Sequence, residues 1–110
     1  MPLLSISIDE TVLSLRRDQL VAALPAIRDM LCTRLDVPQE LSHLTIVSVI
    51  GADTQHKVNA DMRVLKKDSR PRDLIDAVAG DLQQQLSRIC DTPAAVRVAI
   101  MRPDEYLARR

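Results

Sequence analysis

Pro2 is the residue of this sequence with the most distinctive chemical potential, because it directly follows Met1. A small second residue favours removal of Met1, which would leave Pro2 as a secondary amine at the chain start. An α-amino group titrates near about 8, and an apolar pocket with a nearby cation disfavours its charged form. Such an amine would be largely neutral at pH 7 and able to remove a proton next to a carbonyl. If Met1 stays attached, the proline nitrogen is an amide and cannot act as a base.

Two polar residues in otherwise apolar strand patterns are candidates for binding an anionic substrate. His43 begins a run of β-forming residues, and an imidazole can donate a hydrogen bond to an oxyanion. A polar residue at a strand edge is the alternative interpretation of His43. Arg97 alternates with Val96 and Val98, and a guanidinium can bind a carboxylate through two hydrogen bonds. The alternative for Arg97 is pairing with an acid in a subunit interface.

The composition disfavours several other functions. Fifteen basic and fifteen acidic residues give a net charge of zero, and no basic run suggests a nucleic-acid partner. No leader pattern and no apolar stretch of about 20 residues is apparent, so we expect a cytoplasmic protein that does not enter a membrane. Cys32 and Cys90 form no CxxC motif, which suits a reducing compartment. Neither a nucleophile with a nearby His and acid nor a metal-ligand pattern is recognisable, so nucleophilic hydrolysis is poorly supported and no metal is expected.

The first half of the chain has the pattern of a strand, a helix and a second strand. Residues 2–9 alternate apolar and other side chains, which predicts a strand. Asp18 then opens a helical stripe, although Pro25 requires that the helix either bends or starts late. The stripe consists of Leu20, Leu24, Ile27, Leu31 and Leu35. Residues 43–50 follow as a nearly continuous run of β-forming residues, as expected for a second strand.

The second half repeats this order. Residues 58–65 alternate, a second helical stripe follows, and residues 96–101 alternate again. The second stripe consists of Ile75, Val78, Leu82, Leu86 and Ile89. A shift of 55 positions places Arg17 on Arg72, Asp18 on Asp73, Ala22 on Ala77, Leu31 on Leu86, Asp36 on Asp91 and Pro38 on Pro93. The chain is therefore predicted to contain two βαβ repeats.

These repeats predict one α+β domain over residues 1–110, with a four-stranded sheet and two helices on one face. The halves are residues 1–50 and 57–102, joined by a linker, and residues 103–110 form a tail that either makes a short helix or frays. We expect the other sheet face to be apolar and bare, so that neighbouring subunits cover it. A core with only 1% aromatic residues also favours an oligomer. A dimeric ferredoxin-type sandwich is the alternative architecture.

The same residues resemble the tautomerase superfamily, and within it the 5-carboxymethyl-2-hydroxymuconate isomerases. The resemblance rests on Met1-Pro2 leading into a strand, on the junction Leu35-Asp36-Val37-Pro38, and on Ala52-Asp53, His56, Met62, Leu65-Lys66 and Arg70. It implies a homotrimer with active sites between subunits, no cofactor, and a 1,3-allylic keto-enol isomerisation in aromatic catabolism. The chain departs from related enzymes at Ser42-His43-Leu44-Thr45, where they carry an arginine.

The resemblance also implies which cations bind the substrate. Arg70 matches the family's motif, with a helix-capping surface arginine as the alternative. Arg16 resembles the loop arginine of the oxalocrotonate enzymes, although Arg17 is an equally close match in position. We therefore expect Pro2 to act as the base, and Arg70, Arg97, His43 and Arg16 to bind a small carboxylated substrate. A proline-based decarboxylase or hydratase, and a non-catalytic oligomeric binding module, are the alternative functions.

Overall fold

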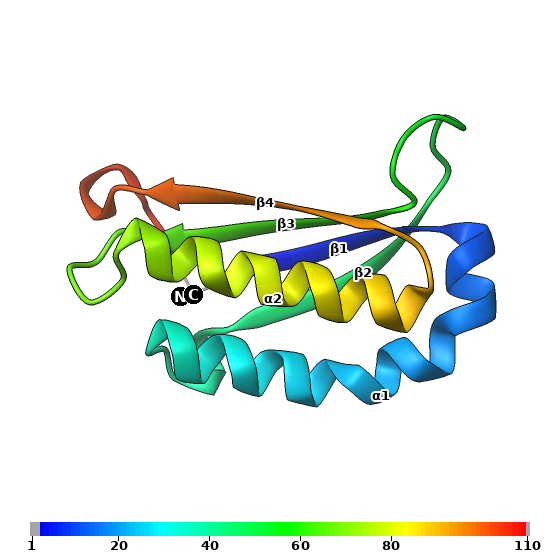
Figure 1. Ribbon diagram of the computed structural model, residues 1–110. Helices are drawn as coiled ribbons and strands as arrows, with labels where there is room; N and C mark the ends of the chain where they lie inside the picture. The colour runs from blue at the N-terminus through cyan, green and yellow to red at the C-terminus, as the bar shows by residue number, and fades with distance from the viewer. Residues whose placement is uncertain (1–2, 110) are drawn as a thin grey trace.

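The computed structural model describes residues 3–109, so the expected base Pro2 lies outside the described residues. The elements follow in the order β1 (Leu3–Asp9), α1 (Glu10–Leu35), η1 (Gln39–Leu41), β2 (His43–Val49), β3 (Val58–Leu65), α2 (Arg72–Cys90), β4 (Ala94–Met101) and η2 (Pro103–Glu105), where η denotes a 3₁₀ turn. Both helices lie on the same side of the sheet, as Figure 1 shows. The predicted α+β class is confirmed.

The sheet has the strand order β2-β1-β3-β4. Strands β1 and β2 are parallel, β3 and β4 are parallel, and the two central strands β1 and β3 are antiparallel. Each βαβ unit therefore returns to the strand beside the one it left, which confirms the two repeats. In a ferredoxin-type sandwich another strand separates the two strands of each unit, so that alternative is wrong.

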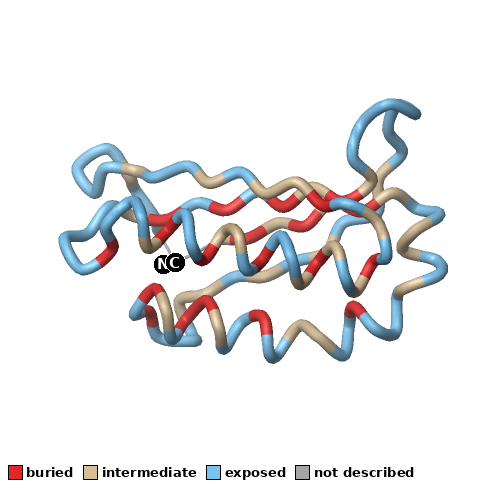
Figure 2. Tube along the Cα trace, in the orientation of Figure 1, coloured by how far each residue is buried: buried red, intermediate tan, exposed pale blue. Residues whose placement is uncertain are grey.

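The core lies between the sheet and the two helices. Alternate residues of the central strands point toward the helices and are buried: Leu4, Ile6 and Ile8 in β1, and Val58, Ala60, Met62 and Val64 in β3. Both predicted helical stripes supply the opposing layer, and their fully buried members are Leu20, Ile27, Leu31, Leu35, Val78, Leu82 and Leu86. Burying each such side chain contributes about 1.5–3 kcal/mol. Figure 2 shows buried positions recurring along the central strands and along both helices.

Helix α1 begins eight residues before the expected start at Asp18, so that expectation is wrong. The Asp9 side chain accepts a hydrogen bond from the backbone N–H of Thr11 at 3.0 Å, and this N-cap starts the helix directly at the end of β1. The first turns contribute no fully buried residue, although Val12 and Leu13 pack partly buried against the core. The charged residues 16–18 interrupt the apolar stripe before Leu20, which explains why the stripe does not reveal these turns. In Figure 1 these turns are inclined to the rest of α1.

Pro25 lies inside α1 without ending the helix. Proline lacks the N–H that would bond to the carbonyl of Val21. Both residues are on the exposed side of the helix, where water can bond to that carbonyl instead. Of the two possibilities left open by the sequence, the late start is therefore wrong. Within residues 3–109, neither helix is long and apolar enough to span a membrane.

The two helices end in the same way, at positions related by the predicted shift of 55. Asp36 and Asp91 both adopt left-handed backbone conformations, with φ of 55° and 52°. Their backbone N–H groups donate to the carbonyls of Cys32 and Ser87, which are themselves 55 positions apart. This conformation is uncommon for residues other than glycine, although aspartate tolerates it better than most.

The sheet face turned away from the helices is mixed in polarity, so the expectation of an apolar bare face is wrong. In β1 and β3 the apolar side chains occupy the inward positions. The outward positions of these two strands carry Leu3, Ser5, Ser7, Asp9, Asn59, Asp61, Arg63 and Leu65. The predicted tail helix is present as the single 3₁₀ turn η2, with Pro103 at its start.

Candidate functional site

The sheet has two ends of different character. At the near end β1 and β2 begin and β3 and β4 end, because β1 and β3 are antiparallel. Leu3, the first described residue, pairs with His43 on one side and Arg63 on the other. Helix α1 ends and α2 begins at this same end (Figure 1). The near end is therefore the part of the fold that the chain enters directly after Pro2.

Arg70 is a buried charged side chain at the near end, with 5% of its surface exposed. Its Nε donates to the carbonyl oxygen of Leu35 at 2.7 Å, and its Nη1 donates to that of Leu65 at 2.7 Å. Leu35 is the last residue of α1 and Leu65 the last of β3, so the guanidinium joins the two halves. Burial lowers the pKa of Arg70, and the nearby charge of Asp36 opposes this effect.

A cavity of about 330 Å³, here called the tail pocket, lies beside Arg70. Its walls are mostly apolar, but they also include three cationic side chains and one carboxylate. The lining residues are Asp36, Val37, Pro38, Leu41, Leu65, Lys66, Lys67, Arg70, Pro103 and Tyr106. They come from the connection after α1, the turn after β3, and the tail after β4. Tyr106, the sole aromatic residue of the chain, is thus part of a pocket wall.

A second cavity of about 330 Å³, here called the open-face pocket, lies on the face that the helices leave uncovered. It is lined by Leu3, Leu4, Ser5, His43, Thr45, Asp61 and Arg63. The candidate His43 therefore lies at the start of β2, beside Leu3, with its side chain exposed. This pocket combines a histidine, an arginine, two hydroxyls and one carboxylate, a set that can bond to an oxyanion from several directions.

Arg97 lies on the same uncovered face, one strand beyond the open-face pocket. It pairs in register with Asp61, and its Nη1 donates to Oδ1 of Asn59 at 3.1 Å. The structure thus brings His43 and Arg97 onto one face but does not place Arg97 in the pocket wall.

Arg16 lies at the far end of the sheet, near the start of α1. Its Nη2 is 3.5 Å from Oδ2 of Asp91, the C-cap residue that follows α2. Within one chain, therefore, Arg16 lies at the opposite end of the sheet from His43 and Arg70. The exposed positions of the two side chains mean that this ion pair contributes little to stability.

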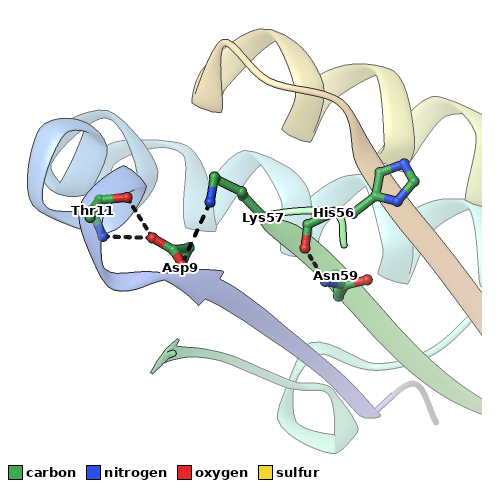
Figure 3. A network of polar contacts seen from close by, with 5 residues as sticks. All are labelled: Asp9, Thr11, His56, Lys57 and Asn59. Atoms are coloured by element: carbon green, nitrogen blue, oxygen red, sulfur yellow. Dashed lines mark hydrogen bonds and ion pairs between the residues drawn. The ribbon is translucent and has the colours of Figure 1, made fainter. Parts of the chain in front are cut away.

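A network of polar contacts at the far end has a structural role (Figure 3). Asp9 accepts hydrogen bonds from both the backbone N–H and the hydroxyl of Thr11, and its Oδ2 lies 3.9 Å from Nζ of Lys57. The Thr11 side-chain bond, the Thr11 backbone bond and the Lys57 charge lower the pKa of Asp9. The His56 carbonyl accepts from Asn59 at 2.9 Å. This network fixes the start of α1 and the linker between the halves.

The sequence interpretation did not identify Arg63, Asp61, Lys67 or Tyr106 as members of a near-end site. The alternation of side chains along β3 was informative, because Arg63 lies between the buried residues Met62 and Val64 and must therefore point away from the core. The register between the two halves was not available from the pattern, however. Only the pairing of Leu3 with Arg63 shows which outward residues of β3 meet the start of β1.

No protein-family model matches the sequence, and no curated protein matches it either. Several solved structures share the fold. Pt0534 inactivated by 2-oxo-3-pentynoate has a TM-score of 0.67 and 13% identity, covering 94% of this chain and 89% of its own. N1, a member of the cis-3-chloroacrylic acid dehalogenase family, has a TM-score of 0.71 and 7% identity, covering 96% and 79%. A fused 4-OT asymmetric trimer has a TM-score of 0.67 and 11% identity, covering 96% and 91%. The chain therefore has the tautomerase-like fold.

Proposed function

We infer that this protein is a keto-enol tautomerase in which the amine of Pro2 is the base. The substrate class is an unsaturated carboxylated keto acid, such as 5-carboxymethyl-2-hydroxymuconate in aromatic catabolism. The observation that carries this proposal is the position of the tail pocket. Its apolar walls and the cations Lys66, Lys67 and Arg70 lie at the sheet end where β1 begins.

The proposed reaction moves one proton along a conjugated system. The neutral amine removes a proton from the carbon or enol oxygen at one end and returns it to a carbon at the other end, so no oxidant or reductant is consumed. Negative charge accumulates on the carbonyl oxygen between these two steps. Fixed donors near that oxygen stabilise the enolate, and His43 is the proposed donor on the open face. Apolar walls favour the neutral amine because they disfavour its charged form.

Carboxylate groups of the substrate require cations around the base. Arg70 is proposed to make the tail pocket more positive, because it lies in the pocket wall. Arg97 is proposed to do the same for the uncovered face of the sheet. Arg16 lies at the far end of its own chain and would have to come from a neighbouring subunit. A homotrimer with sites between subunits would allow this, and the fused 4-OT structure of the same fold is a trimer.

The proposal is tested by intact mass followed by an enol-to-keto absorbance assay with 2-hydroxymuconate. We expect Met1 to be absent from the purified protein and Pro2→Ala to reduce kcat/KM by about 100-fold or more. Wild-type protein treated with 2-oxo-3-pentynoate should carry the label on Pro2, as tested by peptide mapping. Retained Met1 without activity would instead support the non-catalytic binding module, and activity indifferent to Pro2 would show that Pro2 is not the base.

The dehalogenase-family member among the structures of this fold motivates a second candidate, a proline-based hydratase or decarboxylase. The two reactions differ in their products. Isomerisation leaves the mass of the substrate unchanged, whereas hydration adds water and decarboxylation removes carbon dioxide. Mass analysis of the product mixture therefore separates the candidates in the same experiment.

A further inference from the structure

The guanidinium of Arg70 is poorly placed to contact a ligand directly, although the residue lies in the wall of the tail pocket. Its two hydrogen bonds, each 2.7 Å long, go to the backbone carbonyls of Leu35 and Leu65. The arginine itself is only 5% exposed. Turning the guanidinium toward a carboxylate would remove the donor from both carbonyls, and unpaired buried carbonyls are strongly disfavoured. The nearby charge of Asp36 already partly neutralises this cation. The main role of Arg70 is therefore to hold together the backbone segments that end at Leu35 and Leu65.

Lys66 and Lys67 have the opposite character. Both are exposed, both line the tail pocket, and both lie in the turn between β3 and Arg70. Their long side chains can adjust their conformation to contact a bound ligand, whereas backbone hydrogen bonds hold the main chain of the turn. The N–H of Lys66 donates to the carbonyl of Met101 at 2.7 Å, and the N–H of Arg70 donates to the carbonyl of Lys67 at 2.9 Å.

The turn is therefore held at both ends, and Arg70 supplies one of the attachments. Its backbone closes the turn on Lys67, and its side chain ties the turn to the last residue of β3 and the last residue of α1. Two ammonium groups presented from a fixed backbone beside apolar walls suit a ligand with an apolar or conjugated body and a carboxylate at one end.

We propose that Lys66 and Lys67 bind the carboxylate of the substrate, and that Arg70 is a positioning residue that holds their turn in place. This assignment rests on the proposed function, because it concerns the same pocket. It differs from the sequence-based expectation, in which Arg70 itself contacts the carboxylate. The ligand is recognised as an anion whose charged end lies at residues 66 and 67 and whose body lies against Leu41, Leu65 and Tyr106.

The test measures binding separately from turnover. Titration calorimetry with trans,trans-muconate, an unreactive dicarboxylate, gives the dissociation constant of each variant. The double variant Lys66→Met/Lys67→Met should raise it by about tenfold, because two charge-assisted contacts are lost. The matched control is Arg88→Met, which removes an exposed cation from the last turn of α2 at the far end and should bind like wild type.

A double-mutant cycle tests the positioning role of Arg70. Arg70→Lys keeps the charge but cannot span both carbonyls, so it should weaken muconate binding in the wild-type background. In the Lys66→Met/Lys67→Met background the same change should have almost no further effect on binding, because the residues through which it acts are gone. A purely structural role of Arg70 would lower the unfolding midpoint equally in both backgrounds without this dependence.

Three results would overturn the assignment. The first is wild-type affinity in the lysine double variant, the second is additive effects of Arg70→Lys in the two backgrounds, and the third is no muconate binding by wild type. Wild-type protein that binds muconate but shows no tautomerase activity would contradict the proposed function only. Normal turnover with unchanged binding by the lysine variant would contradict this inference only.

Discussion

The connections between helices and strands are longer at the near end of the sheet than the equivalent connections of the repeat at the far end. At the far end, β1 passes directly into α1, and α2 is followed by β4 after residues 91–93. At the near end, residues 36–42 separate α1 from β2, and residues 66–71 separate β3 from α2. The tail pocket is built from these two longer connections and the tail. The repeat thus forms the framework, and the departures from the repeat form the site.

The sharpest test of the shared framework compares one core residue from each helix. Ile27 and Leu82 are related by the shift of 55, and both are fully buried. Ile27→Ala and Leu82→Ala should each destabilise the protein by about 2–5 kcal/mol, because each leaves a cavity in the same core. Urea unfolding at one fixed protein concentration measures both. A large cost in one half and a negligible cost in the other would show that the halves do not share one core.

Arg70 and its counterpart provide the next comparison, because the shift of 55 relates Arg70 to Leu15. Leu15 is 78% exposed on the first turns of α1, whereas Arg70 is 5% exposed. Arg70→Met should cost about 2–4 kcal/mol, since two buried carbonyls lose their donor, and Leu15→Ala should cost less than about 0.5 kcal/mol. Equal free energies of unfolding for the two variants would refute the structural role of Arg70.

The left-handed helix ends allow a smaller comparison. Asp91→Gly should stabilise the protein by about 1 kcal/mol, because glycine adopts a positive φ without steric cost. Asp36→Gly should gain less, because it also removes the negative charge beside Arg70. Thermal unfolding ranks the two variants. A larger gain at Asp36 than at Asp91 would mean that its charge does not stabilise Arg70.

The smallest expected effect concerns the helix starts. Asp9 caps α1, whereas Pro71 precedes α2 without a side-chain cap. The hydrogen bonds from Thr11 lower the pKa of Asp9 in the folded state. The stabilisation by this cap is therefore present above the pKa of the unfolded chain, about 3.9, and is lost as the pH falls through the lower pKa of the folded protein. Acidification should therefore increase amide exchange in the first turn of α1 before that of α2. In Asp9→Asn this difference should disappear, and its persistence would contradict the role of Asp9.

The sequence predicted the parts of the fold that depend on burial. Strand alternation identified the inward residues of β1, and the shift of 55 matched Asp36 with Asp91, which share a backbone conformation. The start of α1 was missed because the charged residues 16–18 interrupt the apolar stripe before Leu20, although Asp9 at the strand end was a usable capping signal. The expectation of an apolar uncovered face was not drawn from this alternation, which leaves Ser5, Ser7 and Asp9 of β1 on the outward side.

The site was predictable only in part, for a reason of geometry. His43 and Arg70 do lie at the near end, but the pattern could not show that Arg70 is directed to two backbone carbonyls. The neighbours of Leu3 depend on the register of β1 against β3, and a strand pattern is compatible with several registers. The roles proposed for Pro2, His43, Arg70, Arg97 and Arg16 remain predictions.

The position of Tyr106 also has an optical consequence. Tyrosine is the sole aromatic residue type in this chain, with one copy and neither tryptophan nor phenylalanine, so the intrinsic fluorescence comes from this single ring. Because that ring lies in the wall of the tail pocket, the emission reports on the pocket while the core is spectroscopically silent. Far-ultraviolet circular dichroism, in contrast, reports on the helices and the sheet. The protein thus carries a native probe that can separate occupancy of the pocket from unfolding of the chain.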